Sequence, residues 1–251
     1  MNKALLEVHG LTKRFGALLA SDNIDLEVQE GETHAVIGPN GAGKTTLIAQ
    51  LAGNLRPDMG RVRFAGEDVT ALSPQARSRK GFARSFQITS VYSDFTALEN
   101  VMLAVQAHAG HSFRFWRPAH EDSALFSPAR TILDKVGLAG RSDVLAANLA
   151  HGEQRQLEIA TALATRPRLM LLDEPVAGMG VEETRHMIEF LSTLKGEKTI
   201  ILVEHDMDAV FTLADRVSVL VYGRIIATGT PQEIRANPEV RRAYLGEEMG
   251  V

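Results

Sequence analysis

Hydrophobic and polar residues alternate in two short stretches of the N-terminal quarter of the chain. In the first stretch Ile24, Leu26 and Val28 are apolar, and the residues between them are acidic. Residues 61–64 alternate in the same way, with arginine at positions 61 and 63. An alternation with a period of two places the apolar side chains on one face of a strand. Both stretches therefore predict half-buried strands of an antiparallel sheet.

Four other runs are apolar at nearly every position. They cover residues 34–37, 169–172, 199–203 and 217–221. Strands that are buried on both faces of a parallel sheet have this composition. Helical stretches, such as residues 182–194, lie between the runs. This alternation of strands and helices predicts the α/β sheet of a nucleotide-binding protein.

The middle of the chain has a different pattern. From about residue 98 to residue 164 the apolar residues follow helical spacing, as Leu98, Val101 and Val105 do, and strand signals are few. We expect this part to form a helical subdomain inserted between the early and the late strands. Within it, residues 108–128 are expected to be a loop, which carries Phe113, Phe115 and Trp116.

Composition limits the functional class. The 251 residues are 45% hydrophobic and 23% charged, as in an ordinary globular protein. A net charge of −4 gives no support to nucleic-acid binding, and the absence of cysteine excludes disulfides, thiol catalysis and cysteine-based zinc sites. The N-terminus lacks the apolar core of a signal peptide, and the apolar runs are shorter than the roughly 20 residues that cross a bilayer. A membrane role is therefore expected to depend on a partner.

A glycine-rich segment follows the apolar run at 34–37. Its sequence, GPNGAGKT, fits the pattern G-x-x-x-x-G-K-[ST], and a helical stretch comes after it. Glycines let backbone N–H groups turn toward phosphate oxygens, and the helix N-terminus adds positive potential. In such a loop Lys44 neutralises the β- and γ-phosphates, and Thr45 offers its hydroxyl to Mg²⁺. The predicted phosphate-binding residues are Gly38, Pro39, Asn40, Gly41, Ala42, Gly43, Lys44, Thr45 and Thr46.

Two acidic residues end the apolar run at 169–172. Asp173 stands at the carboxyl end of this predicted strand, where ligands bind in open α/β sheets. Its carboxylate is suited to hold Mg²⁺, usually through water, and Glu174 is suited to polarise the attacking water. The alternative, a pair of solvated acids at a strand end, is disfavoured beside a phosphate-binding loop. Together the two motifs predict hydrolysis of a nucleoside triphosphate.

Residues 149–163 narrow the class of NTPase. They read LAHGEQRQLEIATAL, which resembles the signature motif of ABC (ATP-binding cassette) ATPases, usually written LSGGQ and followed by a helix. Phe15, Gln87 and His205 stand in the order and spacing of three further family features: the aromatic residue that stacks on adenine, the Q-loop and the switch histidine. The resemblance extends over essentially the whole chain. Taken alone, Phe15 could be a core aromatic residue, and His205 a satisfied histidine at a strand end.

The resemblance implies a fold and a division of the chain. The fold class is α/β: a P-loop NTPase core of the RecA-like kind, with an antiparallel β-subdomain and an inserted helical subdomain. Residues 1–251 would form a single nucleotide-binding domain. Its catalytic core and β-subdomain would comprise residues 1–87 and 166–251, and its helical subdomain with the signature would comprise residues 88–165, approximately.

The resemblance also implies a site shared between two subunits. ABC ATPases bind ATP between subunits arranged head to tail, so that the phosphate loop of one faces the signature of the other. The catalytic residues would be Glu174, His205, Gln87 and Lys44. The Mg²⁺ ligands would be Thr45, Gln87 and Asp173. ATP would contact Phe15 and the phosphate loop of one subunit. In the other subunit it would contact Leu149, Ala150, His151, Gly152 and Glu153.

Two positions depart from the family pattern. Ala150 replaces the usual serine of the signature, so one hydroxyl to the γ-phosphate is missing. Residues 176–180 read VAGMG where the family commonly has TSALD, so the aspartate of that loop is absent. A single hydrogen bond contributes about 0.5–1.5 kcal/mol net, whereas the backbone N–H groups around Gly152 need no side chain. We therefore expect the signature to work, somewhat weakened.

Several segments resemble the ATP-binding subunits of branched-chain amino acid importers in particular. They are GFARSFQ, the form of the signature, LDEPVAGMG, the loop at 108–128 and the end of the chain at 237–248. That group pairs two ATPase subunits with two membrane-spanning permease subunits and a periplasmic solute-binding protein, and this chain resembles the longer ATPase. ATPases of urea or amide import and of lipopolysaccharide export are similar. A soluble ABC ATPase without a transport role is a further alternative.

The resemblance implies a peripheral subunit at the cytoplasmic face of a bacterial inner membrane. The permease subunits would contact residues 88–98, where Tyr92 and Phe95 are aromatic residues suited to an interface; core packing is the alternative for both. The second ATPase subunit would be a copy of this chain or a different one. The solute-binding protein would act only indirectly, and no nucleic acid is expected as a partner.

Overall fold

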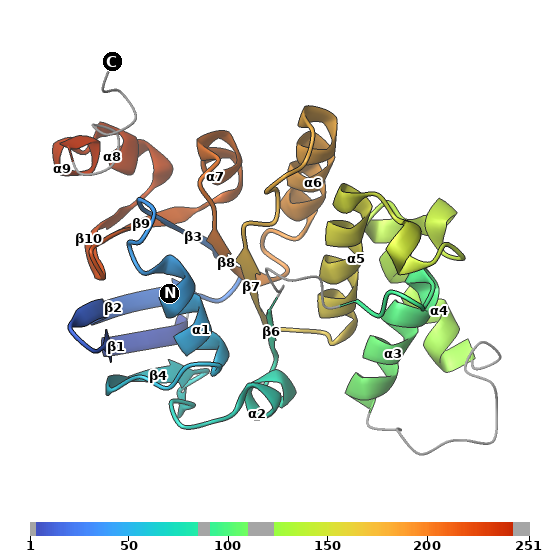
Figure 1. The fold of residues 1–251 in the computed structure, drawn as a ribbon, viewed down its shortest axis with the longest axis horizontal. Coiled ribbons are helices and arrows are strands. Elements are labelled where there is room, and N and C mark those ends of the chain that lie inside the picture. Colours follow the sequence, from blue (N-terminus) through green and yellow to red (C-terminus); the bar gives the residue numbers. More distant parts are fainter. Residues whose placement is uncertain (1–3, 85–90, 110–122, 243–251) are drawn as a thin grey trace.

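An antiparallel sheet forms one part of the computed structural model, which describes residues 4–84, 91–109 and 123–242 (Figure 1). Its strand order is β2-β1-β4-β5. The strands are β1 (Ala4–Phe15), β2 (Leu18–Gln29), β4 (Met59–Phe64) and β5 (Glu67–Asp68). In β2 the apolar residues of the predicted alternation are buried and the acidic ones between them are exposed. Both predicted antiparallel strands, β2 and β4, are therefore confirmed.

A second sheet has six strands in the order β10-β9-β3-β8-β7-β6. The strands are β3 (Thr33–Ile37), β6 (Phe82–Arg84), β7 (Leu169–Asp173), β8 (Thr199–Val203), β9 (Arg216–Val221) and β10 (Arg224–Gly229). Neighbouring strands are parallel except β9 and β10, which are antiparallel. The four apolar runs thus form the parallel strands β3, β7, β8 and β9, as predicted.

Burial on both faces explains why these strands are apolar throughout. In β7, Leu169 and Leu171 pack in a cluster with residues of the antiparallel sheet and of helix α1 (Lys44–Ala52). Met170 and Leu172 belong to the opposite cluster, which includes residues of helix α6 (Val181–Thr193). Every side chain of the strand therefore leaves water, and no polar alternation can arise.

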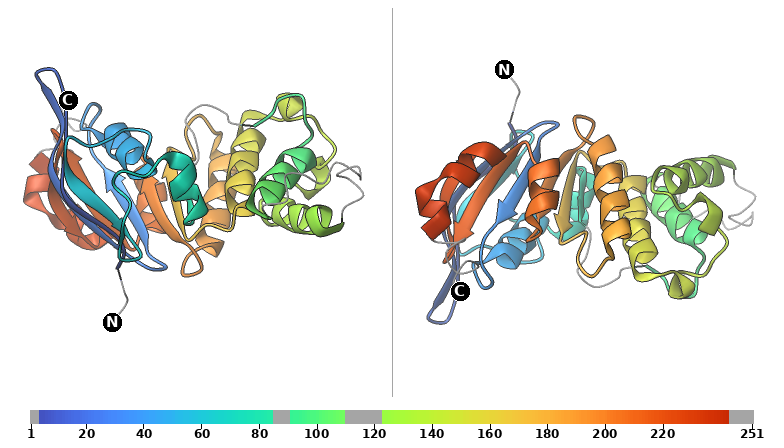
Figure 2. Two further views of the ribbon diagram at one scale, coloured as in Figure 1. Left: turned by 90° about the horizontal axis from the view of Figure 1, so that it is seen from below. Right: turned by 90° about the horizontal axis from the view of Figure 1, so that it is seen from above.

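The helical part lies at one end of an elongated molecule, and the two sheets occupy the rest (Figure 2). It contains α3 (Ala97–Ala109), α4 (Ser123–Lys135), the short 3-10 turns η2 (Ala139–Arg141) and η3 (Ala146–Asn148), and α5 (His151–Ala164). Val101, Leu133 and Leu157 share one core cluster with β7 and β8. The predicted helical insertion is confirmed, and its core is continuous with one face of the parallel sheet.

The expected loop at 108–128 is wrong at both ends. Helix α3 continues to Ala109, and α4 begins at Ser123 and contains Pro128. Proline has no N–H to donate within a helix, so Pro128 is an unfavourable residue inside α4. Helix α4 forms nevertheless because Leu125, Ala129 and Leu133 give it a buried apolar face. The aromatic residues of the expected loop lie outside the described residues.

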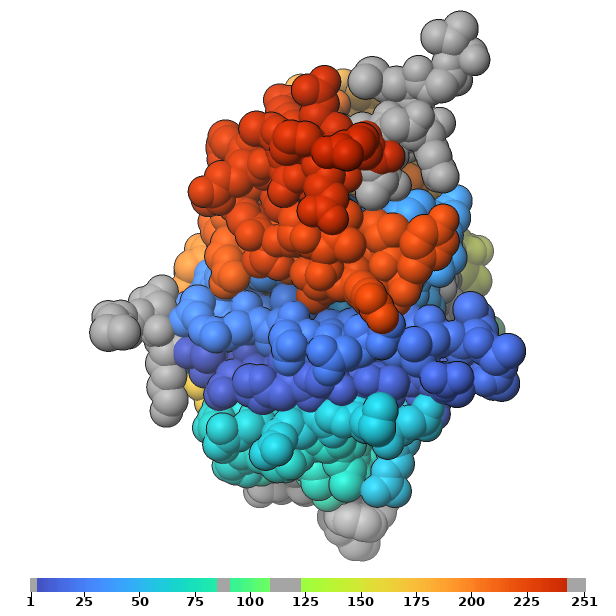
Figure 3. All heavy atoms as spheres, turned by 90° about the vertical axis from the view of Figure 1, so that its left-hand side faces the viewer, coloured from blue at the N-terminus to red at the C-terminus, as the bar shows by residue number. Residues whose placement is uncertain are grey.

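The remaining helices pack at different places on the parallel sheet. Helix α2 (Pro74–Arg79) precedes β6 and contacts it, and α7 (Met207–Leu213) packs in a cluster with β3 and β9. Helices α8 (Pro231–Ala236) and α9 (Pro238–Val240) contact the edge strand β10. In a view of this end of the molecule, β1 and β2 lie between the β4–β5 region and the C-terminal strand and helices (Figure 3). Among the described residues, no helix is both long and apolar enough to cross a membrane.

Candidate nucleotide-binding site

A cavity of about 590 Å³ opens at the N-terminus of α1. It is lined by Phe15, Leu18, Leu19, Ala20, Asn40, Gly41, Ala42, Gly43, Lys44, Thr45, Thr46, Glu174 and Tyr222. The structure thus brings together the predicted adenine-stacking residue, most of the predicted phosphate loop and the predicted catalytic glutamate. Phe15 is 47% exposed at the end of β1, which argues against the alternative that it is a core residue. The volume lies in the range usual for small-ligand sites.

Two positions of the loop accept only glycine. A Cβ atom on Gly38, directly after β3, would lie 2.0 Å from the carbonyl oxygen of Leu220. Gly43 has a φ of +105°, and a Cβ there would lie 2.3 Å from the carbonyl oxygen of Ala20. The chain therefore passes close to β9 and β2 before it enters α1, whose N-terminus opens on the cavity. This geometry presents backbone N–H groups and the positive end of a helix to a phosphate.

Lys44 is held inside the loop. Its Nζ donates to the carbonyl oxygens of Gly38, at 2.6 Å, and Pro39, at 3.0 Å. Burial lowers the pKa of Lys44, and the nearby charges of Glu174 and Asp173 oppose that effect. The ammonium group therefore lies beside the cavity and binds two uncharged carbonyl oxygens. A charged phosphate oxygen forms a stronger hydrogen bond and can replace them.

Asp173 and Glu174 stand at the carboxyl end of β7. Asp173 is 2% exposed, burial raises its pKa, and the charge of Arg84 works in the other direction. Glu174 has a φ of +51°, and its N–H donates to the carbonyl of Val203 at 2.8 Å. This turn takes the chain out of the sheet and brings Glu174 to the cavity. Carboxylate and hydroxyl oxygens, as on Asp173 and Thr45, are the ligands that Mg²⁺ prefers.

His205, the predicted switch histidine, lies beside Glu174, the predicted catalytic residue. Its Nδ1 is 3.7 Å from Glu174 Oε1, and its side chain is 61% exposed, so it is not enclosed in the core. The residue before it, Glu204, was missed by the sequence reasoning. The Glu204 carboxylate accepts the N–H groups of Val176, at 3.0 Å, and His205, at 3.1 Å. The only sequence signal was an acid at the end of an apolar strand. Burial raises the pKa of Glu204.

The signature residues lie at the start of α5, on the side of β7 away from α1 (Figure 1). The helix begins at His151, so Gly152 lies in its first turn and not in a loop before it. Ala150 is the N-cap and has no side-chain cap, while Glu153 accepts the N–H of Ala150 at 2.9 Å. A Cβ on Gly152 would lie 2.9 Å from the carboxylate carbon of Glu183. Gln87 lies outside the described residues.

Comparison with known proteins agrees with this arrangement. The sequence profile of the ABC transporter family matches residues 21–177, and the profile named "Branched-chain amino acid ATP-binding cassette transporter" matches residues 224–249. The branched-chain amino acid transport ATP-binding protein BraF of Pseudomonas aeruginosa is 41% identical over 254 residues, which cover 98% of this chain and 100% of BraF. LivG of Escherichia coli K12, of the same description, is 39% identical over 259 residues, with coverage of 98% and 100%.

Solved structures show the same fold. A nucleotide-free ATP-binding cassette from an ABC transporter superposes with a TM-score of 0.83 at 29% identity, covering 95% of this chain and 97% of that one. A dimeric ATP-binding cassette bound to ADP and Pi gives a TM-score of 0.77 at 24% identity, with coverage of 90% and 98%. The cassette fold predicted from the sequence is thereby confirmed.

The chain therefore belongs to the ABC transporter family, as an ATP-binding and ATP-hydrolysing cassette. Within that family it belongs to the ATP-binding proteins of branched-chain amino acid transport. The resemblance drawn from the signature and the other motifs is confirmed.

Proposed function

We propose that this chain powers the import of branched-chain amino acids as one of two ATPase subunits of a membrane transporter. The full-length likeness to BraF and LivG carries the proposal, because this chain spans 100% of both proteins. A sulfate/thiosulfate import ATP-binding protein, CysA 2 of Chromobacterium violaceum, is 35% identical, but this chain spans only 63% of it. The match of residues 224–249 to the branched-chain amino acid profile favours that group over other import systems. We expect a peripheral position at the cytoplasmic face of the membrane.

ATP hydrolysis would take place in the cavity at α1. Phe15 would stack on the adenine, and Lys44 would exchange its two carbonyl partners for β- and γ-phosphate oxygens. Thr45 and Asp173 would hold Mg²⁺, together with Gln87. Bound Mg²⁺ neutralises charge that develops on the phosphates. A water molecule would attack the γ-phosphorus and pass a proton to Glu174 while the bond to the ADP oxygen breaks. His205, 3.7 Å from Glu174, would hold that carboxylate in place.

The second half of the site would come from another subunit. The signature of this chain lies on the far side of β7 from its own cavity, so one chain alone does not surround a nucleotide (Figure 1). A head-to-tail pair would bring Gly152 and the N-terminus of α5 to the γ-phosphate of the partner. A helix N-terminus with free N–H groups suits that charge. Hydrolysis would remove this shared phosphate and let the pair open.

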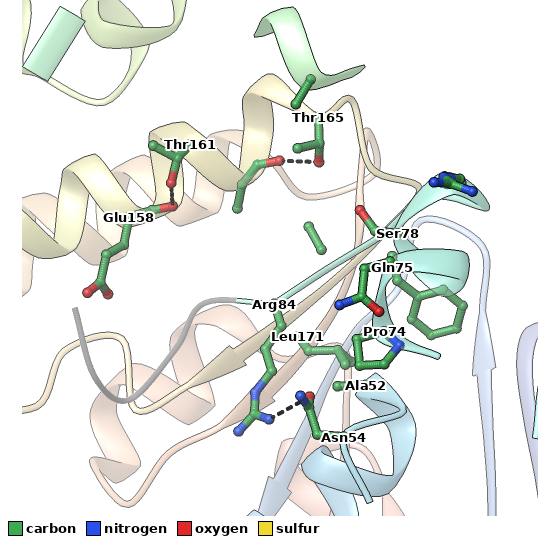
Figure 4. A pocket seen from close by; sticks show the side chains of 15 residues that line it. Ala52, Asn54, Pro74, Gln75, Ser78, Arg84, Glu158, Thr161, Thr165 and Leu171 are labelled. Carbon is green, nitrogen blue, oxygen red and sulfur yellow. Dashed lines mark hydrogen bonds between the residues drawn. The ribbon is translucent and has the colours of Figure 1, made fainter. Parts of the chain in front are cut away.

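The permease subunits would bind near residues 88–98, of which residues 88–90 lie outside the described residues. Tyr92 is 63% exposed and Phe95 39%, and their ring centroids are 5.4 Å apart. Asn100 fixes the backbone beneath them, because its Oδ1 accepts the N–H of Tyr92 at 2.7 Å and its Nδ2 donates to the Tyr92 carbonyl. A fixed backbone with exposed aromatic rings suits an interface better than core packing. A separate cleft of about 510 Å³ lies between α2, β6 and α5 (Figure 4), and its lining includes neither Tyr92 nor Phe95.

Glu174→Gln tests the proposed chemistry. The variant should bind ATP normally, form a stable ATP-bound pair of subunits and hydrolyse at least ~100-fold more slowly, the scale of a positioned general base. Glu182→Gln is the matched control, because Glu182 is an exposed acid eight residues on, and it should behave as wild type. Hydrolysis by Glu174→Gln within a few-fold of wild type at saturating ATP would show that another group activates the water.

Substitution at the aromatic pair tests the docking surface. Tyr92→Ala and Phe95→Ala should lose co-purification with the permease subunits from native membranes, while the isolated chain keeps its melting temperature and ATP affinity. A sharp drop in melting temperature in both variants would instead support core packing.

A further inference from the structure

Arg84 connects two residues that flank the nucleotide site. It ends strand β6, and its Nη2 lies 3.4 Å from Asp173 Oδ2. Its Nη1 lies 3.3 Å from Asn54 Oδ1, just beyond the end of α1, as the dashed line in Figure 4 shows. Because α1 begins at Lys44, Arg84 reaches from the far end of the phosphate-loop helix to the carboxylate proposed to hold Mg²⁺. No motif of the sequence pointed to this contact.

The contact lies away from water. The Arg84 side chain is 14% exposed and that of Asp173 is 1% exposed. The Arg84 guanidinium therefore places a positive charge beside a carboxylate that water hardly reaches. A buried carboxylate without a counter-charge is strongly destabilising. A cation that binds Asp173 during the ATP cycle must therefore compete with the Arg84 guanidinium for this carboxylate.

We propose that Arg84 neutralises Asp173 when no cation is bound and gives up this carboxylate to Mg²⁺ when Mg²⁺ and ATP bind. The inference rests on the Mg²⁺ site proposed above. Two positive charges near one carboxylate repel each other, so bound Mg²⁺ weakens the contact between the guanidinium and Asp173. Asn54 Oδ1 is a second partner that can retain it. Arg84, which stands three residues before Gln87 in the sequence, is therefore a positioning residue. It sets how strongly the affinity for nucleotide depends on Mg²⁺.

The test compares the affinity of the full-length chain for a non-hydrolysable ATP analogue in Mg²⁺ and in EDTA. In Arg84→Gln the analogue should bind more weakly in EDTA, because the Asp173 carboxylate has lost the charge of Arg84 and repels phosphate more strongly. In Mg²⁺ it should bind as tightly as to wild type or more tightly, because the competitor is gone. The ratio of the Kd in EDTA to the Kd in Mg²⁺ should rise about 10-fold over that of wild type, which is within the usual range of coupling between two sites. Arg84→Lys keeps the charge and should stay within about 3-fold of wild type.

Arg168→Gln is the matched control. Arg168 immediately precedes the opposite end of β7 and pairs with Glu30 at 2.7 Å, so the variant removes the same charge without touching Asp173. Its Kd ratio should equal that of wild type. Thermal unfolding gives a second readout: Arg84→Gln should melt lower than wild type without Mg²⁺ and gain more than wild type from Mg²⁺ and the analogue together.

The outcomes separate the two proposals. If the analogue binds wild type equally well with and without Mg²⁺, the proposed Mg²⁺ site itself fails. If wild type responds to Mg²⁺ and a folded Arg84→Gln variant responds equally, the role of Arg84 is overturned. If Arg84→Gln does not fold, Asn54→Ala tests the proposal instead. Without the Asn54 oxygen Arg84 should release Asp173 less readily, and the ratio of the Kd in EDTA to the Kd in Mg²⁺ should fall by about 3-fold. An unchanged ratio in Asn54→Ala would then overturn the proposal.

Discussion

Glu204→Gln separates the positioning of the catalytic residues from the stability of the fold. The Glu204 side chain is fully buried, and its two oxygens accept the N–H groups of Val176 and His205. Val176 lies in the turn that follows Glu174, and His205 Nδ1 is 3.7 Å from Glu174 Oε1. One carboxylate thus fastens the backbone on both sides of the proposed general base.

Two effects of this substitution on the free energy of unfolding oppose each other. Glutamine keeps one acceptor oxygen but turns an NH₂ group toward the other backbone N–H, and a buried donor left without an acceptor costs about 1–3 kcal/mol. The charge has a cost as well, because burial raises the pKa of Glu204. A raised carboxyl pKa contributes stability that is present at low pH and lost as the pH rises through it. At neutral pH glutamine removes that cost, so the net change should stay below about 1 kcal/mol.

Turnover should fall much further than stability. Loss of the hydrogen bond from the N–H of Val176 or His205 costs about 1–3 kcal/mol. If that energy no longer holds the catalytic groups in place, the rate falls roughly 5- to 150-fold. The KM for ATP should stay within about 2-fold, because Glu204 is not among the residues that line the ATP cavity. The assay is steady-state ATPase activity of the complete transporter, beside chemical unfolding of the isolated chain. Glu197→Gln, at an exposed acid before β8, is the control. Turnover within 2-fold of wild type would refute the reasoning.

Three further predictions concern other sites. Burial raises the pKa of Glu32, but the hydrogen bond with His34 and other contacts outweigh it, so the pKa is lowered. The stability that Glu32 contributes is present above the ordinary carboxyl pKa of about 4.3 and is lost as the pH falls below it. Lowering the pH from about 5 to 3 should therefore reduce the free energy of unfolding, measured by chemical unfolding, more in wild type than in Glu32→Gln. Gly152→Asp should abolish turnover of the complete transporter. Adding Glu183→Ala should not restore turnover, because the new negative charge still repels the γ-phosphate bound to the partner subunit. Recovery in the double variant would mean that the loss comes from a clash with Glu183. Ala150→Ser should stabilise the isolated chain by about 0.5–2 kcal/mol as a better N-cap and change turnover by less than ~10-fold; a larger gain in turnover would mean that the missing hydroxyl limits the site.

The fold was predictable where one physical requirement governed a whole element. Burial on both faces makes β7 and β8 apolar throughout, so their positions followed from composition alone. Strand β1 was not predicted because its pairing with β2 shifts register between Val8 and Leu11, which interrupts the period of two. The first half of helix α4 was placed in the expected loop, but packing of its apolar face extends the helix through Pro128.

The site was predictable where it is contiguous in sequence. The phosphate loop joins a strand to a helix within a few residues, and Asp173 and Glu174 directly follow β7. Contacts between distant segments were not predictable. Arg84 is 89 positions from Asp173, and Glu204 is 28 positions from Val176. Neither pairing has a local pattern, because only the assembled sheet brings β6 beside β7 and β7 beside β8.

Uptake of labelled leucine by cells tests the central claim most directly. Cells that lack the gene for this chain should lose ATP-dependent uptake of leucine, isoleucine and valine, while uptake of urea is unchanged. The wild-type gene should restore that uptake, and a gene for Glu174→Gln, expressed to the same level, should not. Leucine uptake that is unaffected by the deletion, or that is restored by Glu174→Gln, would contradict the account.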